Sequence, residues 1–324
     1  MSTMTSSPGA PFTAAAACRR PGTWLRMLCL LVIPVITSGC NDTDNPQLIP
    51  RQVSRRSIPA AGATIPAPRA VTTAPDDTLY LLDNAGRVLV FDPNGKPVRQ
   101  WDMPESDVGN PEGICVLSNG RIAVADTHYH RVVVFDASGH VLRMIGQEGQ
   151  DDGDFYWPVA VVEDDQQNRF VSEYGGANRV QKFDSQWRHL LTFGGIGDLP
   201  GEFQRPSGMV WHAGRLYIVD AFNDRIQVFD GGGRFLEILG SQDESGRLHY
   251  PYDIALGPGE DLWVVEYGAG RVSRFNLRGD LQGRFGSTGS GPNQFGTPWG
   301  LAVDSTNRIW VADTRNHRLV SIDF

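Results

Sequence analysis

The chain has 324 residues, including 37 glycines and 21 prolines, and 40% of its residues are hydrophobic. That hydrophobic share is enough for a packed core, and the many turn-forming residues favour an all-β fold. The formal net charge is −8, and only two lysines are present, Lys96 and Lys182. A nucleic-acid partner requires a basic surface that neutralises phosphates, so this composition argues against one.

The first forty residues have the organisation of an export signal. Arginines precede a short apolar run at 27–36, and Ser38-Gly39-Cys40 follows it. A positive segment, an apolar segment and small residues before a cleavage site are typical of a secretory signal peptide. The apolar run is about ten residues long and contains Pro34, so it is too short to span a membrane.

The ending Ser38-Gly39-Cys40 resembles a bacterial lipobox, although Thr37 stands where leucine is usual. In that motif the cysteine is lipidated and becomes the mature N-terminus. We therefore expect a signal peptide at 1–40, a lipid on Cys40 and a short linker at 41–49. The protein would be extracytoplasmic and anchored to a bacterial membrane, on the periplasmic side in a Gram-negative cell. An ordinary secreted protein with a coincidental cysteine is the alternative.

Residues 68–324 repeat one pattern six times, which is the strongest signal in the sequence. Each unit starts with a proline before an apolar strand: Pro68, Pro111, Pro158, Pro206, Pro251 and Pro298. Each has an acid at the end of a second strand: Asp83, Asp126, Glu173, Asp220, Glu266 and Asp313. Each then has an arginine that opens a third strand: Arg87, Arg131, Arg179, Arg225, Arg271 and Arg318. Successive members of each series are 43–48 residues apart, so the three series describe one repeat.

Each repeat contains four short β-rich runs, as residues 205–240 show. Glycine, asparagine and aspartate separate the runs, and these residues build tight turns. A four-stranded unit of roughly 40–50 residues is typical of a propeller blade. The sequence therefore predicts an all-β, six-bladed β-propeller with four-stranded blades over residues 50–324.

The last repeat indicates how the ring closes. It ends after its third strand, at residues 319–324, so its fourth strand must come from elsewhere. The spacing in the other repeats places that strand near residues 50–57, a polar segment that suits a charged outer edge. We predict that 50–57 pairs with 319–324.

The amino-acid sequences of the repeats closely resemble NHL repeats, most clearly at residues 119–126, 223–230 and 307–318. The resemblance covers residues 68–324 and is weakest in the first repeat. It implies that the loops between second and third strands lie on the same face as the entries to the first strands. Aromatic and acidic residues are frequent at both places, so we expect them to gather on that face.

The acid series has two interpretations. An acid at a strand end can accept loop N–H groups and pair with the arginine of its own repeat. We expect this role for Asp83, Asp126, Asp220 and Asp313. Glu173 and Glu266 are longer acids, and each continues as Tyr-Gly. They form either the same framework or an acidic and aromatic clamp over the central channel, between the third and fifth blades.

On the clamp hypothesis we predict a ligand site on this face, without a catalytic assignment. Its candidate residues are Trp157, Glu173, Tyr174, Tyr252, Asp253, Glu266, Tyr267 and Trp299. The acids would favour a cationic or polyhydroxylated partner, or a divalent cation held by oxygens. The aromatic rings would supply most of the binding energy. No other cofactor or metal is expected.

A binding or scaffold function leads over an enzymatic one. Peptidyl-hydroxyglycine amidating lyases share the propeller fold and bind zinc through histidines directly after the entry proline. The matching positions here hold no histidine: Glu112, Val159, Ser207, Tyr252 and Trp299. A calcium-type hydrolase or lyase with its site in the channel stays open as the alternative. A rigid rim of loops with aromatic rings beside charges favours recognition, so we expect a monomeric propeller that binds an envelope protein, a peptide or a glycan.

Overall fold

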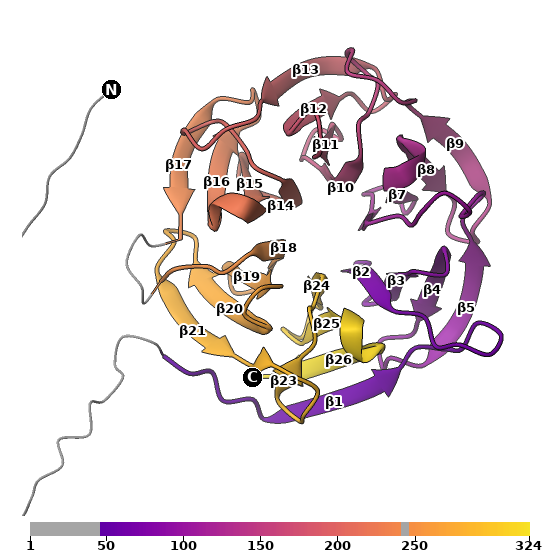
Figure 1. Ribbon diagram of the computed structural model, residues 1–324, viewed down its shortest axis with the longest axis vertical. Helices are drawn as coiled ribbons and strands as arrows, with labels where there is room; N and C mark the ends of the chain where they lie inside the picture. The colour runs from indigo at the N-terminus through magenta and orange to yellow at the C-terminus, as the bar shows by residue number, and fades with distance from the viewer. Residues whose placement is uncertain (1–45, 241–245) are drawn as a thin grey trace, which may run out of the picture. The chain divides into compact units, whose positions relative to one another are not determined.

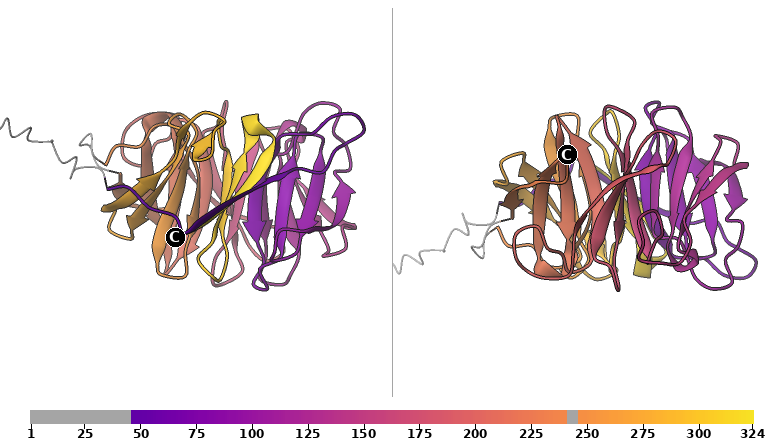
Figure 2. Two further views of the ribbon diagram at one scale, coloured as in Figure 1. Left: turned by 90° about the horizontal axis from the view of Figure 1, so that it is seen from below. Right: turned by 90° about the horizontal axis from the view of Figure 1, so that it is seen from above.

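The computed structural model describes residues 46–240 and 246–324. These residues form six antiparallel four-stranded sheets, arranged as blades around a common axis (Figure 1). Seen from the side, the strands of the blades run between the two faces of the ring (Figure 2). The predicted six-bladed β-propeller is confirmed. The predicted signal peptide and Cys40 lie outside the described residues.

Blades one to five each take four consecutive strands, with the innermost strand first. Blade one contains β2 (Pro68–Thr73), β3 (Leu79–Asp83), β4 (Arg87–Phe91) and β5 (Pro97–Asp102). Blade two contains β6 (Gly113–Val116), β7 (Ile122–Asp126), β8 (Arg131–Phe135) and β9 (Val141–Ile145). Blade three contains β10 (Pro158–Glu163), β11 (Arg169–Glu173), β12 (Arg179–Phe183) and β13 (His189–Gly194).

Blade four contains β14 (Pro206–His212), β15 (Arg215–Asp220), β16 (Arg225–Asp230) and β17 (Phe235–Leu239). Blade five contains β18 (Pro251–Leu256), β19 (Asp261–Glu266), β20 (Arg271–Asn276) and β21 (Leu281–Phe285). A short parallel pair, β22 (Ser287–Thr288) and β23 (Gln294–Phe295), lies in the connection to blade six. Blade six contains β24 (Gly300–Val303), β25 (Ile309–Asp313) and β26 (Arg318–Asp323), and its outermost strand is β1 (Gln52–Ser57).

Strand β1 closes the ring. It pairs antiparallel with β26, from Gln52 opposite Asp323 to Ser57 opposite Arg318, and Figure 1 shows the two strands side by side. The predicted closing strand is therefore confirmed. The chain just before β1 also runs along blade five, because the N–H of Leu48 donates to the carbonyl of Arg284 at 2.8 Å. This segment thus joins the last two blades.

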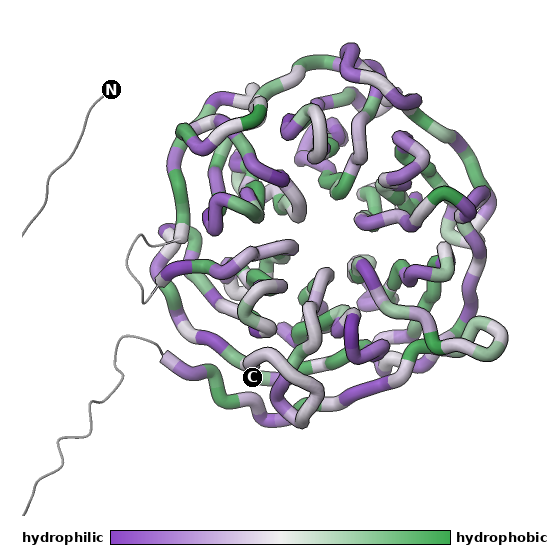
Figure 3. Tube along the Cα trace, viewed as in Figure 1, coloured by the Kyte–Doolittle hydropathy of each residue, from purple (hydrophilic) through white to green (hydrophobic). Residues whose placement is uncertain are grey.

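The core lies between neighbouring blades. Strands β3, β7, β11 and β25 are buried at every position. A middle strand is covered on both faces by the adjacent blades, which explains its continuous apolar run. Leu82 and Val88 of blade one, for example, pack with Val124 and Val133 of blade two. Hydrophobic stretches accordingly recur around the whole ring in Figure 3.

The turns between third and fourth strands share one hydrogen-bond pattern, in which a side-chain oxygen accepts backbone N–H groups of the same turn. The Oδ1 of Asp92 accepts hydrogen bonds from the N–H groups of Asn94 and Lys96, two and four residues later, at 3.0 and 2.8 Å. Such side-chain acceptors stabilise tight turns. The same arrangement recurs at Asp136, Asp184, Asp230 and Asn276.

Helical structure within the described ranges is limited to three short 3₁₀ turns. They are η1 (Thr127–Tyr129), η2 (Ala221–Asn223) and η3 (Thr314–Asn316), and each follows the acid of its blade. Over residues 46–240 and 246–324, no helix is both long and apolar enough to cross a membrane.

Candidate functional site

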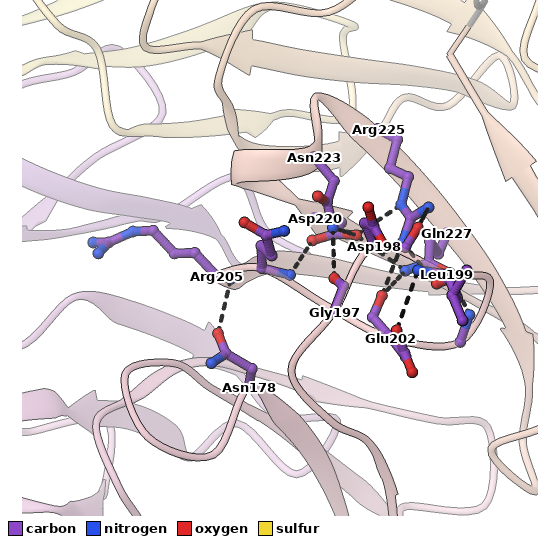
Figure 4. A network of polar contacts seen from close by, with 12 residues as sticks. Asn178, Gly197, Asp198, Leu199, Glu202, Arg205, Asp220, Asn223, Arg225 and Gln227 are labelled. Carbon is purple, nitrogen blue, oxygen red and sulfur yellow. Dashed lines mark hydrogen bonds and ion pairs between the residues drawn. The ribbon is translucent and has the colours of Figure 1, made fainter. Parts of the chain in front are cut away.

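The acids of the repeated pattern form the framework of one face. All six are completely buried, and each pairs with the arginine of its own blade at 2.6–3.0 Å. Figure 4 shows the blade-four example, in which Asp220 accepts hydrogen bonds from the N–H of Gln204 and from Arg225. Arg225 also donates to three carbonyls of the preceding loop: Asp198, Leu199 and Glu202. The pair therefore ties the entry loop to the second and third strands.

Glu173 and Glu266 belong to this same framework. Glu173 accepts hydrogen bonds from the N–H of Tyr156 at 2.7 Å and from Arg179 Nε at 3.0 Å. Glu266 accepts the N–H of His249 at 2.8 Å and pairs with Arg271. Burial raises the pKa of Glu173, as expected for a carboxyl with no exposed surface. Neither glutamate offers its carboxylate to a ligand at the channel mouth.

The length of these two acids follows from their turns. In blades two, four and six the acid is an aspartate, and a 3₁₀ turn follows it. In blades three and five a Tyr-Gly sequence follows instead, and no 3₁₀ turn forms there. From this different turn the longer glutamate side chain reaches the N–H two residues before the entry proline and the arginine of its blade, as Asp220 and Asp313 do. The exchange of aspartate for glutamate is thus explained by local geometry.

The predicted aromatic residues do come together on this face. The Trp157 ring lies 5.3 Å from Tyr174 and 5.2 Å from Tyr156, measured between centroids. The Tyr252 ring lies 4.7 Å from Trp299. Tyr250 links Tyr267, at 4.8 Å, to Phe222, at 5.2 Å. We call this set the aromatic belt: Tyr156, Trp157, Tyr174, Phe222, Tyr250, Tyr252, Tyr267 and Trp299.

The backbone before each entry proline sets the direction of several of these side chains. Trp157, Arg205 and Tyr250 have φ values of 57°, 63° and 47°. This left-handed conformation is uncommon for residues with side chains and needs support from neighbours. Asn178 supplies it by accepting the N–H of Arg205 at 2.9 Å, and Asp224 accepts the N–H of Tyr250 at 2.7 Å. Each support comes from the preceding blade.

Arg205 joins the two halves of the aromatic belt. Its guanidinium lies 4.0 Å from the ring centroid of Tyr174 and 5.6 Å from that of Tyr252, which are favourable cation–π distances. It also donates to the Tyr252 hydroxyl at 3.2 Å and lies 3.7 Å from the Glu112 carboxylate. Burial alone lowers the pKa of Arg205, but Tyr252 and Glu112 raise it further than burial lowers it. The side chain stays charged.

Glu112 continues this hydrogen-bond network at the central channel. It is 7% exposed and accepts hydrogen bonds from the hydroxyls of Tyr252 at 2.6 Å and Tyr174 at 3.4 Å. Blade two supplies Glu112 and blade five supplies Tyr252, so the shorter bond joins opposite blades of the ring. Burial, followed by the charge of Glu112, holds the pKa of Tyr252 well above its usual value, so its hydroxyl remains a donor.

A cavity of about 300 Å³ follows the central channel below this network. First strands of all six blades line it, and Glu112, Tyr252 and Trp299 form its end beside the aromatic belt. Asp253 also lines it and accepts the N–H groups of Ile254 at 2.9 Å and Leu301 at 3.0 Å. Burial raises the pKa of Asp253 to about 7. This acid therefore lies inside the channel and not on the rim.

Metal-ligating side chains do not cluster in the part of the chain that the structure describes: no three of its His, Cys, Asp and Glu residues are grouped to hold a metal ion. Residues outside our candidate set contribute to the site, namely Arg69, Glu112, Arg205, Phe222 and Tyr250. Four of these, all except Phe222, flank an entry proline, and comparison of that position between repeats is the signal that identifies them.

The fold and the site together define a six-bladed β-propeller whose loop-bearing face surrounds a central channel. A family profile described as NHL repeat matches residues 109–135 and 295–320, in blades two and six. These two matches, together with the six four-stranded blades, support an NHL-repeat propeller.

Relatives of known sequence match parts of the chain. Protein brain tumor from Drosophila melanogaster is 28% identical over 144 residues, which cover 44% of this chain and 13% of that protein. NHL repeat-containing protein 3 from Mus musculus is 26% identical over 207 residues, which cover 59% and 58% of the two chains. E3 ubiquitin-protein ligase NHLRC1 from Homo sapiens is 27% identical over 138 residues, which cover 41% and 32%. The chain thus spans less than two thirds of each of these relatives.

Solved structures with a similar fold include two enzymes. A streptogramin B lyase superposes with a TM-score of 0.61 at 14% identity, over 84% of this chain and 97% of that one. A gluconolactonase from Xanthomonas campestris superposes with a TM-score of 0.61 at 14% identity, over 86% and 97%. At this level of identity the similarity shows the fold alone.

Proposed function

We propose that this protein is a cell-envelope binding or scaffold protein that recognises a protein, peptide or glycan partner with its aromatic belt. The observation that carries this proposal is the continuity of the aromatic belt over blades three to six. Its rings are held in place by one another and by Arg205, so little side-chain freedom is lost on binding. Rigid aromatic side chains of this kind contribute most of the energy in many interfaces.

The outer end of the aromatic belt offers exposed apolar surface. Phe222 is 58% exposed, and Ile196 and Leu199 in the adjacent loop are 71% and 62% exposed. Asn223 holds this loop beside Phe222 by donating to the carbonyl of Gly197 at 3.0 Å. Apolar side chains fixed next to aromatic rings and an arginine favour a recognition surface.

The capture of a partner from envelope extract tests this function. In a Phe222→Ala, Tyr250→Ala double variant we expect capture to be lost. Tyr250 also packs against the core, so circular dichroism must show that the double variant is folded at the assay temperature. Leu142→Ala is the matched control, since Leu142 is 48% exposed on the outer strand of blade two. Equal capture by wild type and the double variant would exclude the aromatic belt as the binding surface.

The proposed location is extracytoplasmic and anchored to a bacterial membrane, and it rests on the lipid proposed on Cys40. A Cys40→Ser variant should move to the soluble extracytoplasmic fraction or stay unprocessed. Membrane fractionation measures this, and unchanged membrane partition of the variant would contradict the anchor.

Asp253 supports the alternative of a hydrolase or lyase with its site in the channel. A carboxyl with a pKa of about 7 suits acid–base catalysis near neutral pH. If a divalent cation takes part, calcium or magnesium should raise the melting temperature of wild type and not that of Asp253→Asn. The same rise in both proteins, or none in either, leaves the binding function as the better explanation.

A further inference from the structure

Arg69 lies where the aromatic belt meets the channel. It follows Pro68 at the start of β2, and its guanidinium lies 3.8 Å from the ring centroid of Trp299 in blade six. Trp299 contacts the Tyr252 ring at 4.7 Å and lines the end of the cavity. Arg69 therefore extends the aromatic belt into blade one.

The guanidinium of Arg69 is not matched by any acceptor of the described chain. Its side chain makes no hydrogen bond or ion pair with residues 46–240 or 246–324, and its Nη1 is buried without a partner. A buried N–H donor without an acceptor costs free energy. The repeated arginines differ, because each of them pairs with an acid.

Glu112, the acid of this network, forms its ion pair with Arg205 and not with Arg69. Glu112 is held by Tyr252 at 2.6 Å, and Arg205 lies 3.7 Å from its carboxylate. Arg205 and Glu112 thus balance each other, whereas Arg69 keeps a full positive charge beside Trp299. This charge stands out in a chain whose formal net charge is −8.

Nη1 is the one Arg69 nitrogen that is buried without a partner, so the edge formed by Nε and Nη2 is left for a ligand. That planar edge matches the two oxygens of a carboxylate, which it binds with parallel charge-assisted hydrogen bonds. The stack with Trp299 also fixes the guanidinium before a ligand arrives, which reduces the entropy lost on binding.

We propose that Arg69 and Trp299 form a carboxylate-binding subsite for an acidic segment of a protein partner. This subsite rests on the proposed binding function and names the chemistry of the partner. A protein fits better than a glycan, because the exposed aliphatic residues Ile196 and Leu199 at the outer end of the aromatic belt are typical of protein interfaces.

The test titrates the purified full chain with a defined peptide in a calorimeter. The peptide is acetyl-Leu-Glu-Glu-Leu-Gly amide, and its reference is the same peptide with glutamine in place of both glutamates. We expect the glutamate peptide to bind about 10- to 100-fold more tightly than the reference, the range for losing one charge-assisted contact. Arg69→Met should remove this preference, and Arg69→Lys should keep part of it.

Arg56→Met is the matched control variant. Arg56 also lies over a tryptophan, Trp310, at 5.5 Å, but it donates to the carbonyl of Asn94 on the outer wall. It should bind the glutamate peptide as wild type does. Arg69 makes no hydrogen bond with the described chain, and a methionine can keep a contact with the Trp299 ring, so we expect Arg69→Met to change the melting temperature little. The melting temperature of each variant then separates weaker binding from unfolding.

Several results would overturn the subsite. One is equal binding of the glutamate peptide by Arg69→Met and wild type, and another is no binding of either peptide to wild type. Sodium glucuronate or inorganic phosphate binding in place of the peptide would assign Arg69 to an acidic glycan or a phosphate. If Arg69→Met keeps partner capture that the Phe222→Ala, Tyr250→Ala variant loses, the subsite fails while the proposed function stands.

Discussion

The exchange Glu173→Gln tests whether the two glutamates are framework or ligand-binding residues. Glu173 is completely buried and accepts hydrogen bonds from Tyr156 N–H at 2.7 Å, Arg179 Nε at 3.0 Å and Gln181 at 2.7 Å. Glutamine has the same shape but one acceptor oxygen fewer and no charge. At least one of these donors must then face an NH₂ group, and Arg179 loses its counter-charge.

We expect this exchange to lower the free energy of unfolding by about 2–4 kcal/mol, below the cost of a fully broken buried ion pair. The reduction arises because Arg179 keeps three carbonyl acceptors, those of Gln150, Asp151 and Asp154. Urea unfolding followed by circular dichroism measures the change. Glu148→Gln is the control, because Glu148 is exposed.

The framework interpretation also predicts faster hydrogen exchange at the amide of Tyr156 and unchanged partner capture. A Glu173→Gln variant with the stability of Glu148→Gln and with lost capture would refute the reasoning and restore the clamp hypothesis.

Two further predictions concern the channel and the ring closure. Burial raises the pKa of Asp253 to about 7, so the native state binds this proton more tightly than the unfolded state does. The protonated Asp253 carboxyl therefore contributes its full stabilisation below about pH 4, and this stabilisation is lost as the pH rises through 7. The unfolding free energy of wild type should therefore fall relative to Asp253→Asn by up to about 3 kcal/mol between pH 5 and pH 8; parallel pH profiles would contradict this. Deleting Gln52–Ser57 should remove the partner of β26, lose several backbone hydrogen bonds at about 1 kcal/mol each and expose a sheet edge. Deleting 41–45 should leave thermal stability unchanged, and equal losses for the two deletions would argue against β1 as the closing strand.

The architecture could be predicted because the repeated residues act locally. All six acids end second strands and all six arginines open third strands in the structure. Each pair lies within one blade and four to six residues apart in sequence, so a single period reveals it. The entry prolines are less regular, since β6 begins two residues after Pro111 and β24 two residues after Pro298.

The site could be predicted only in part. Five residues of the aromatic belt could be predicted because they recur at matching positions of several repeats, whereas Tyr156, Phe222 and Tyr250 were outside the candidate set. The contact between Glu112 and Tyr252 joins residues 140 positions apart, and no local pattern marks such a pair. Glu173 and Glu266 were weighed as ligand residues because their extra length is visible in sequence, whereas the altered turn that explains it is visible only in the structure.

The central claim is that the aromatic belt is the surface by which this propeller recognises its partner. Photo-crosslinking in living cells tests it most directly, with a benzophenone side chain placed at position 222 and, for comparison, at position 142 on the outer wall. We predict a discrete crosslinked partner at position 222 and none at position 142. A crosslink at position 142 alone, or at neither position, would contradict the claim.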